Sequence, residues 1–217
     1  MLAEFSAGAG HELNNPLGAI SGRVQLLLLS ETDSAKRAEL ASILNQVKRA
    51  QDMIADLRLV AAPPKPNFSS FSLKEAFESL QKDFRETFEE RKITWNVRGL
   101  SDSNNDWTAD SVLFQILLRA LLRNSLRAIH ASGEILLRIS FSGAGLELRF
   151  SDTGEGIPEE NRPLIFDPFY SSYQSGRGLG FGLTKARIIA ELHGGTLDFD
   201  PTDTERTTFV LRLPKHV

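Results

Sequence analysis

The feature that most constrains the fold is the proline-rich stretch Ala61-Ala62-Pro63-Pro64-Lys65-Pro66. Proline cannot continue a helix, and the residue before a proline favours extended backbone. The stretch therefore predicts a boundary, with one unit over residues 1–62, a linker over residues 63–66 and a second unit over residues 67–217. A chain of 217 residues is long enough for two small units or one large one.

Before the linker, apolar residues recur with helical spacing in two stretches that residues 30–34 interrupt. Two long amphipathic helices joined by a short link predict an antiparallel hairpin. Such a hairpin has little core of its own, so we expect two copies of the chain to form a four-helix bundle, as a homodimer. The alternative is that the hairpin packs on the rest of its own chain. The two stripes are Leu2, Phe5, Ala9, Leu13, Ile20, Val24 and Leu27, then Leu40, Ile43, Val47, Ala50, Ile54 and Leu57.

After the linker, helical and strand patterns are mixed without a regular βαβ alternation, which favours an α+β sandwich. Helices are expected over residues 72 to about 90, about 111–129 and 185–193, and strands over residues 93–97, 134–141, 146–151, 196–199 and 207–213.

Composition excludes several classes of function. The chain has no cysteine, so it can form no disulfide, thiolate zinc site or cysteine nucleophile. A formal net charge of -3 gives no reason to expect nucleic acid as a partner. The longest apolar run near the start, Leu26 to Leu29, is too short to span a bilayer, and no signal peptide is visible. We therefore expect a cytoplasmic chain without direct membrane contact, either whole or as part of something larger.

His11 lies in the first helical stretch, between Gly10 and Glu12. A lone histidine on a helix is more often a surface or packed residue than a reactive one, but its neighbours favour reactivity. Its ring is substantially neutral near neutral pH and is then nucleophilic. Glu12 could orient the ring or accept a proton, and Asn15 lies one turn further along the same face. Pro16 is not a residue that helix formation alone would select.

The segment His11-Glu12-Leu13-Asn14-Asn15-Pro16-Leu17 resembles the H-box of sensor histidine kinases, in the form common among nitrogen-regulation-like members. The resemblance implies that ATP phosphorylates His11 and that the phosphoryl group passes to an aspartate on a response-regulator receiver domain. Glu12 would act as base or orienting residue. Asn15 would position reactants or assist dephosphorylation of the receiver.

The segment Leu121-Leu122-Arg123-Asn124-Ser125-Leu126-Arg127-Ala128 resembles the N-box of the Bergerat ATP-binding fold. The resemblance implies that Asn124 coordinates Mg²⁺, which prefers oxygen ligands and bridges phosphates. Arg127 stands where the family often has a phosphate-binding lysine, and Arg123 is an alternative. Ala120 departs from the family, because many members have a second asparagine there.

Asp152-Thr153-Gly154-Glu155-Gly156 follows a predicted strand and resembles the G1 box. In the family this aspartate accepts a hydrogen bond from the adenine amino group. Gly154 and Gly156 would let the backbone approach the base closely. A simple aspartate-containing turn is the alternative.

Two further segments resemble the F-box and the G2 box, which are residues 165–170 and 176–183. Phe166 and Phe169 would anchor the ATP lid by packing. The glycines of the G2 box would approach phosphates at a helix N-terminus. A dinucleotide-binding loop is excluded because the glycine spacing is wrong and no strand immediately precedes it. The predicted contacts are Gly176, Arg177, Gly178, Gly180, Gly182 and Leu183; Arg177 and Tyr173 depart from the usual pattern.

The five boxes occur in the family's order, which predicts a histidine autokinase that uses ATP and Mg²⁺. The second unit would move about the linker to bring ATP to His11. Three alternatives remain open: another Bergerat-fold ATPase, a degenerate scaffold or receiver phosphatase suggested by Ala120 and Tyr173, and a dimeric interaction module without catalysis.

Overall fold

The computed structural model divides the chain into two compact units, Met1–Pro64 and Lys65–Val217. It describes residues 2–101, 105–170 and 180–215, with side chains described from residue 12 onward. Among these residues, no helix is both long enough and apolar enough to cross a membrane.

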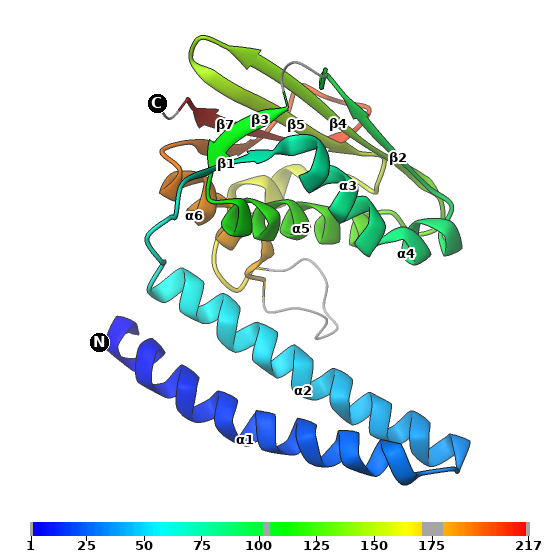
Figure 1. Ribbon diagram of the computed structural model, residues 1–217. Coiled ribbons are helices and arrows are strands. Elements are labelled where there is room, and N and C mark those ends of the chain that lie inside the picture. The colour runs from blue at the N-terminus through cyan, green and yellow to red at the C-terminus, as the bar shows by residue number, and fades with distance from the viewer. Residues whose placement is uncertain (1, 102–104, 171–179, 216–217) are drawn as a thin grey trace. The chain divides into compact units, whose positions relative to one another are not determined.

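The first unit is a helical hairpin of α1 (Leu2–Ser30) and α2 (Ser34–Ala61), which pack against each other (Figure 1). The turn is held by local capping. Asp33 is the N-cap of α2 and accepts hydrogen bonds from the N–H groups of Ala35 and Lys36. The Arg37 guanidinium donates to the carbonyl of Leu28 at 2.7 Å, and so satisfies an open carbonyl at the end of α1.

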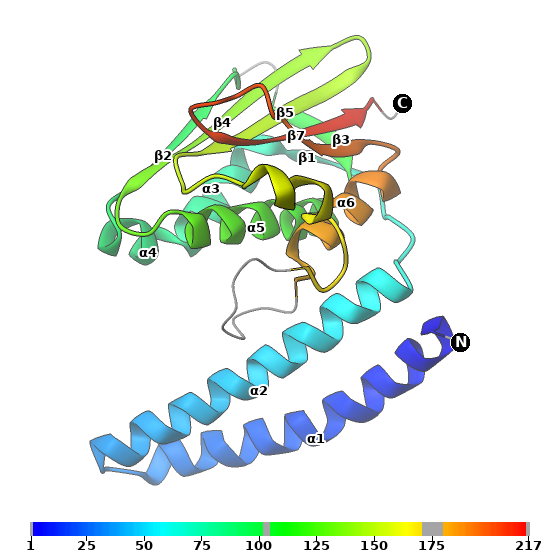
Figure 2. The ribbon, with the colours of Figure 1, turned by 180° about the vertical axis from the view of Figure 1, so that it is seen from behind.

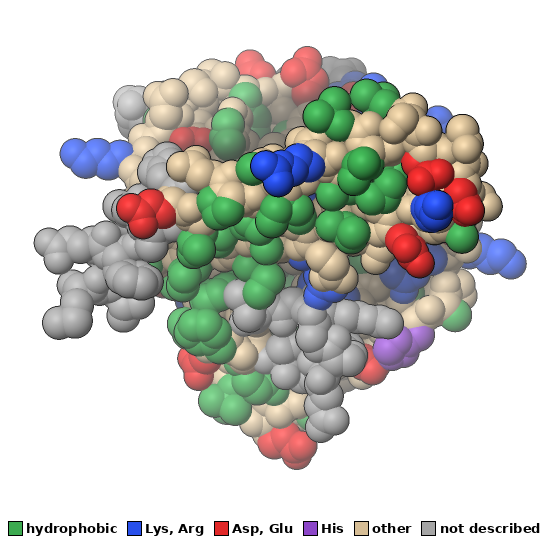
Figure 3. Space-filling model, turned by 90° about the horizontal axis from the view of Figure 1, so that it is seen from below, with side chains coloured by type: hydrophobic (Ala, Val, Ile, Leu, Met, Phe, Trp, Pro, Cys, Tyr) green, Lys and Arg blue, Asp and Glu red, His purple; other side chains and the backbone are tan. Residues whose placement is uncertain are grey.

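The hairpin buries little of its apolar surface. Within its described part, only the hydrophobic side chains of Val24 and Val47 are buried. Figure 3 shows hydrophobic side chains gathered along the hairpin. The large hydrophobic residues exposed on it are Leu13, Ile20, Leu26, Leu27, Leu29, Ile43, Met53 and Leu57. A face of this size and spacing is typical of a helix pair that packs against another surface.

The second unit has two layers, in which helices cover one face of a mixed five-stranded sheet (Figures 1 and 2). The strand order is β2-β4-β5-β7-β6, where β2 and β4 are parallel and the other pairs antiparallel. A separate two-stranded sheet joins β1 to β3. The arrangement confirms the predicted helical hairpin followed by an α+β sandwich. The strands are β1 (Ser69–Ser72), β2 (Ile93–Arg98), β3 (Asp106–Ala109), β4 (Gly133–Ser142), β5 (Gly145–Asp152), β6 (Thr196–Phe199) and β7 (Thr207–Pro214).

The helices of this unit are α3 (Leu73–Asp83), α4 (Arg85–Glu90), α5 (Ser111–Ala128) and α6 (Gly182–Leu192), with a 3₁₀ turn η1 at Glu159–Leu164. The single helix expected over residues 72–90 is therefore wrong, because Phe84 leaves helical geometry at φ -110° and ψ 10°. The break lets Phe88 stack on Trp95 of β2, with ring centroids 5.6 Å apart. Tertiary packing outweighs local helix propensity here.

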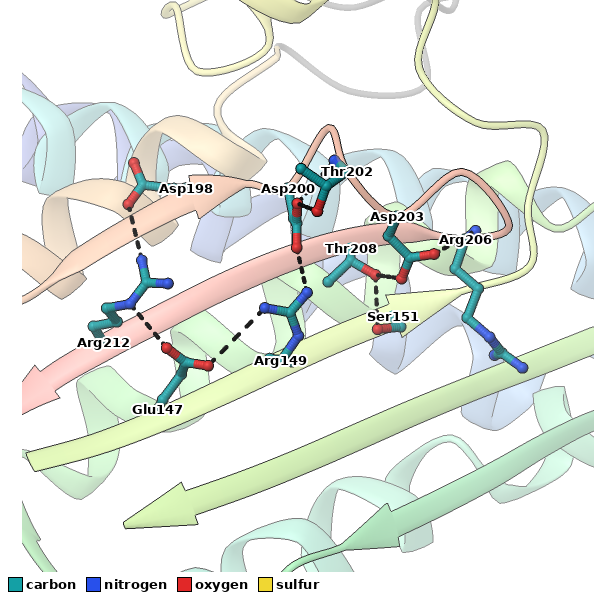
Figure 4. Close-up of polar contacts among 10 residues, drawn as sticks. All are labelled: Glu147, Arg149, Ser151, Asp198, Asp200, Thr202, Asp203, Arg206, Thr208 and Arg212. Atoms are coloured by element: carbon teal, nitrogen blue, oxygen red, sulfur yellow. Dashed lines mark hydrogen bonds and ion pairs between the residues drawn. The ribbon is translucent and has the colours of Figure 1, made fainter. Parts of the chain in front are cut away.

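The core lies between the helices and the sheet, where Phe114, Phe150 and Phe209 are almost completely buried. The other face of the sheet is covered by its own polar contacts (Figure 4). Arg149 of β5 pairs with Asp200, and Arg212 of β7 donates to Glu147 at 2.9 Å. These charged side chains are therefore paired with one another on this face of the sheet.

Candidate functional site

Asp152 ends β5, and its side chain is completely buried. Two groups donate hydrogen bonds to its carboxylate. The Ser125 hydroxyl donates to Oδ2 at 2.5 Å, and the Gly154 N–H donates to Oδ1 at 2.9 Å. A carboxylate has about four lone-pair sites, so these two bonds leave acceptor capacity for a ligand. The site therefore offers an oriented acceptor to an N–H donor.

The environment of Asp152 acts on its pKa in two directions. Burial raises the pKa of the carboxyl, because the charged form loses its hydration. The hydrogen bonds from Ser125 and Gly154, and the charge of Arg206, lower the pKa and so oppose burial. The net direction is upward, which is common among carboxylates of functional sites.

The loop after Asp152 is tied to the end of α5. The N–H of Glu155 donates to the carbonyl of Ala128 at 3.1 Å. A Cβ atom on Gly154 would lie 2.6 Å from the Ala128 Cβ, so packing alone requires glycine there. Gly156 differs, because it has a positive φ of 81° and open space where a Cβ would point. Gly156 is thus the glycine that leaves room for a ligand.

Thr207 is a residue that the sequence did not indicate. It lies opposite Asp152 in the β5–β7 register and is 4% exposed, and its Oγ1 has no hydrogen-bond partner. A buried hydroxyl without a partner is costly, which suggests that it is satisfied by a ligand or water. Ser125 was likewise missed, because its role depends on a contact 27 positions away.

Helix α5 presents the predicted metal and phosphate residues beside this loop. Asn124 precedes Ser125 and is half-buried, while Arg127 and Arg123 are exposed. Ala120 is only 5% exposed, so an asparagine there would have to be accommodated in a buried position. Within the described residues, no group of three or more histidine or acidic side chains could hold a metal ion.

Gly180, Gly182 and Leu183 lie at the start of α6. Gly180 has a φ of 73°, and a Cβ there would lie 2.3 Å from the Tyr170 carbonyl oxygen, so no other residue fits without a shift. The Thr184 hydroxyl donates to the carbonyl of Phe166 at 3.0 Å and joins this turn to the F-box segment. Leu183 is half-buried. Gly176, Arg177, Gly178 and Tyr173 lie outside the described residues.

Both F-box aromatics make ring contacts within the second unit. Phe166 makes an edge contact with Phe209 of β7, with ring centroids 6.2 Å apart. The ring centroids of Phe169 and Phe181 lie 4.7 Å apart, although Phe169 is 67% exposed.

The hairpin carries the predicted phospho-acceptor segment within α1. His11 belongs to this helix, but its side chain lies outside the described part. Glu12 and Asn15 are exposed on the helix surface. Two grooves of 320 and 500 Å³ lie in the second unit between α3, α4 and β2, and none of the predicted site residues lines them.

These features agree with the comparisons to known families. Residues 109–217 match the model of the histidine kinase-, DNA gyrase B-, and HSP90-like ATPases, and residues 1–63 match the His Kinase A (phospho-acceptor) domain. The chain belongs to the histidine kinase-, DNA gyrase B-, and HSP90-like ATPase family. Its phospho-acceptor domain followed by an ATPase domain confirms the predicted class, a sensor histidine kinase.

The chain is also similar to individual histidine kinases. The sensor histidine kinase ZraS of Escherichia coli (strain K12) is 27% identical over 218 residues, which cover 100% of this chain and 46% of ZraS. The chain spans about half the length, or less, of the curated relatives it matches. Full-length ShkA in complex with AMPPNP has a TM-score of 0.82 at 20% identity, over 99% of this chain and 46% of that one. ThkA in complex with the response regulator protein TrrA has a TM-score of 0.68 at 22% identity, over 99% and 62%. These two likenesses show the fold.

Proposed function

We propose that the chain is an ATP-dependent autokinase that phosphorylates its own His11 and donates the phosphoryl group to an aspartate of a response-regulator receiver domain. One observation carries the proposal. A phospho-acceptor domain that contains His11 precedes, in one chain, an ATPase domain with a buried and oriented acceptor at Asp152. Other ATPases of the family, such as chaperone modules, are not expected to carry that first domain.

Asp152 recognises adenine in this proposal. Its carboxylate accepts a hydrogen bond from the exocyclic amino group, and Ser125 and Gly154 fix its orientation before ATP arrives. Guanine has a carbonyl oxygen at the corresponding position, which would face the carboxylate without a proton between them. Gly156 leaves room for the base, and Thr207 supplies a further hydroxyl on the neighbouring strand. The expected specificity is for ATP over GTP.

Asn124 would hold Mg²⁺ through its amide oxygen. Mg²⁺ is often bound by one or two protein ligands together with substrate phosphates. When bound, the ion neutralises charge on the phosphates. The remaining proposed phosphate contacts are Arg127, Gly176, Arg177, Gly178, Gly180, Gly182 and Leu183.

His11 performs the chemical step. A neutral ring nitrogen attacks the γ-phosphorus in line, so an N–P bond forms as the bond to the ADP oxygen breaks. Glu12 orients the ring or accepts the proton from the other nitrogen. Most of the rate enhancement comes from positioning and charge neutralisation, because phosphoryl transfer needs little covalent chemistry from the protein.

A homodimer forms through the hairpin. The exposed residues Leu13, Ile20 and Leu27 are seven positions apart on α1, and they flank the buried Val24. A stripe with this period packs well against a second helix pair. Two hairpins would therefore complete a four-helix bundle.

The partner class follows from the domain order and from one solved relative, since ThkA was crystallised with a response regulator. Asn15 positions the receiver carboxylate that attacks the phosphoryl group on His11, or it assists dephosphorylation of the receiver. The H-box is of the nitrogen-regulation-like kind, and the chain works in the cytoplasm.

Incubation with γ-labelled ATP tests the proposal. We expect an acid-labile, base-stable label in the wild type that is absent in His11→Gln and strongly reduced in Asn124→Ala. Hydrolysis of ATP without any label would instead indicate another Bergerat-fold ATPase. Nucleotide binding without label, combined with faster dephosphorylation of a receiver, would indicate a phosphatase or degenerate scaffold.

A further inference from the structure

A buried pair, Asp110 and His193, joins the start of α5 to the end of α6. Asp110 is the N-cap of α5, and its Oδ1 accepts from the N–H of Leu113 at 2.9 Å. His193 is the C-cap of α6 and is 1% exposed. The N–H of Asp110 donates to His193 Nε2 at 3.0 Å, across 83 positions of sequence.

The partners of His193 fix its tautomer. A backbone N–H can only donate, so Nε2, which faces Asp110, must be the acceptor. A carbonyl oxygen can only accept, so Nδ1, which lies 2.7 Å from the Ile189 oxygen, must carry the proton. Both ring nitrogens of the imidazole are therefore hydrogen-bonded to backbone groups.

The first residues after the proline-rich linker bind the same pair. The N–H of Asn67 donates to Asp110 Oδ2 at 2.8 Å. The ring of Phe68 makes an edge contact with His193, with centroids 5.4 Å apart. The next residues form β1, whose Ser69 pairs with Ala109 of β3 immediately before Asp110. One carboxylate thus serves both the cap of α5 and the point where the linker enters this unit.

We infer that Asp110 and His193 are positioning residues that set the spacing of α5 and α6 and make this spacing depend on the linker. The inference rests on the proposed function, in which α5 carries Asn124 and the start of α6 carries Gly182 and Leu183. These two sets of contacts must hold the same ATP molecule, and α5 and α6 pack on each other. Since a small misplacement of reacting groups reduces rate or affinity sharply, the spacing of the two helices matters.

Three variants of the full chain separate the parts of this inference. His193→Phe keeps a ring for Phe68 but offers no acceptor to Asp110. His193→Gln can place an oxygen near the Nε2 position and so restores that acceptor. Asp110→Asn retains one oxygen for the N-cap, where asparagine is as good as aspartate, but cannot also accept from Asn67. Asp33→Asn is the matched control, because it makes the same change at the N-cap of α2.

We expect His193→Phe to raise KM for ATP about tenfold, because a shift of α6 relative to α5 misplaces the groups that hold ATP, with the maximal autophosphorylation rate changed less than about twofold. His193→Gln should recover most of the affinity. Without nucleotide, amide hydrogen exchange in residues 182–192 should be faster in His193→Phe than in the wild type. Asp33→Asn should change neither quantity.

The linker dependence is tested by a double-mutant cycle between Pro66→Gly and Asp110→Asn. Pro66→Gly should change the KM for ATP in the wild-type background. The same substitution should change the KM for ATP less in the Asp110→Asn background. Equal effects in both backgrounds would overturn the linker part.

A lower thermal midpoint in His193→Phe with unchanged KM and unchanged exchange would overturn the positioning role. If the wild type bound no ATP, the proposed function would fail, while the exchange comparison would still decide for or against the pair.

Discussion

The two units differ in how much of their apolar surface they bury. The hairpin leaves large apolar residues such as Leu26 and Leu29 exposed, whereas the second unit buries Phe114, Phe150 and Phe209 almost completely. The second unit can therefore fold on its own core. The hairpin gains most of its stability only when its apolar face is covered, so its folding should be coupled to association.

The largest expected effect comes from separating the units. The fragment 65–217 should unfold cooperatively, with a thermal midpoint independent of concentration. The fragment 1–64 should lose helicity on dilution, because its buried surface lies between copies. Circular dichroism over a wide concentration range measures both. A hairpin fragment that remains a fully helical monomer on dilution would contradict the expectation that only the hairpin depends on association for its stability.

A core substitution sharpens the contrast within the intact chain. Phe150→Ala should destabilise the second unit by about 3–5 kcal/mol, because it removes a fully buried ring and leaves a cavity. Leu27→Ala, at a site 55% exposed, should instead weaken dimerisation and leave the second unit unchanged. Denaturant unfolding and sedimentation measure the two effects. Equal loss of stability from both changes would contradict this account.

The nucleotide site should respond to loss of the Ser125 hydroxyl. Ser125→Ala should weaken ATP binding about tenfold, because a buried carboxylate loses a charge-assisted hydrogen bond. ATP binding is lost as pH falls and Asp152 becomes protonated, and in Ser125→Ala this loss should occur at a higher pH than in the wild type. The hydroxyl lowers the pKa of Asp152, so without it the carboxyl is protonated at a higher pH, and the protonated form is the poorer acceptor. Titration of ATP affinity against pH tests this, and an unshifted profile would be inconsistent with it.

Asp152→Asn should separate ATP binding from stability. The pKa of Asp152 is raised in the folded state, so the stability associated with its neutral form is present at low pH and is lost as pH rises through the raised pKa. A neutral asparagine should therefore leave the thermal midpoint at neutral pH unchanged or higher while abolishing ATP binding. Loss of both would show that the charge is needed for folding.

The smallest effect is expected on the outer face of the sheet. The Thr202 hydroxyl, then Arg149, lower the pKa of Asp200 to about 2. The stability from this depressed pKa is present above the ordinary value of 3.8 and is lost as pH falls through about 2. Asp200→Asn should cost about 1 kcal/mol at neutral pH, and the difference should vanish in strong acid. Asp198→Asn, whose ion pairs are 3.8 Å long and more exposed, should cost less.

Local patterns predicted much of this molecule. Helical periodicity and the proline-rich stretch predicted the hairpin and the mixed unit. Contacts distant in sequence could not be predicted. Thr207 matters because strand register sets it opposite Asp152, and Ser125 because α5 packs beside β5. The strand β1 was missed because its Ser-Ser-Phe-Ser sequence resembles a loop before a helix cap.

The position of the phosphoryl group tests the central claim most directly. Tandem mass spectrometry of the chain after incubation with ATP and Mg²⁺, kept at neutral to basic pH, locates the modified residue. We predict phosphate on His11 in the wild type and none in Asp152→Asn, although that variant remains folded. Phosphate on another residue, or undiminished phosphate on His11 in Asp152→Asn, would contradict the account.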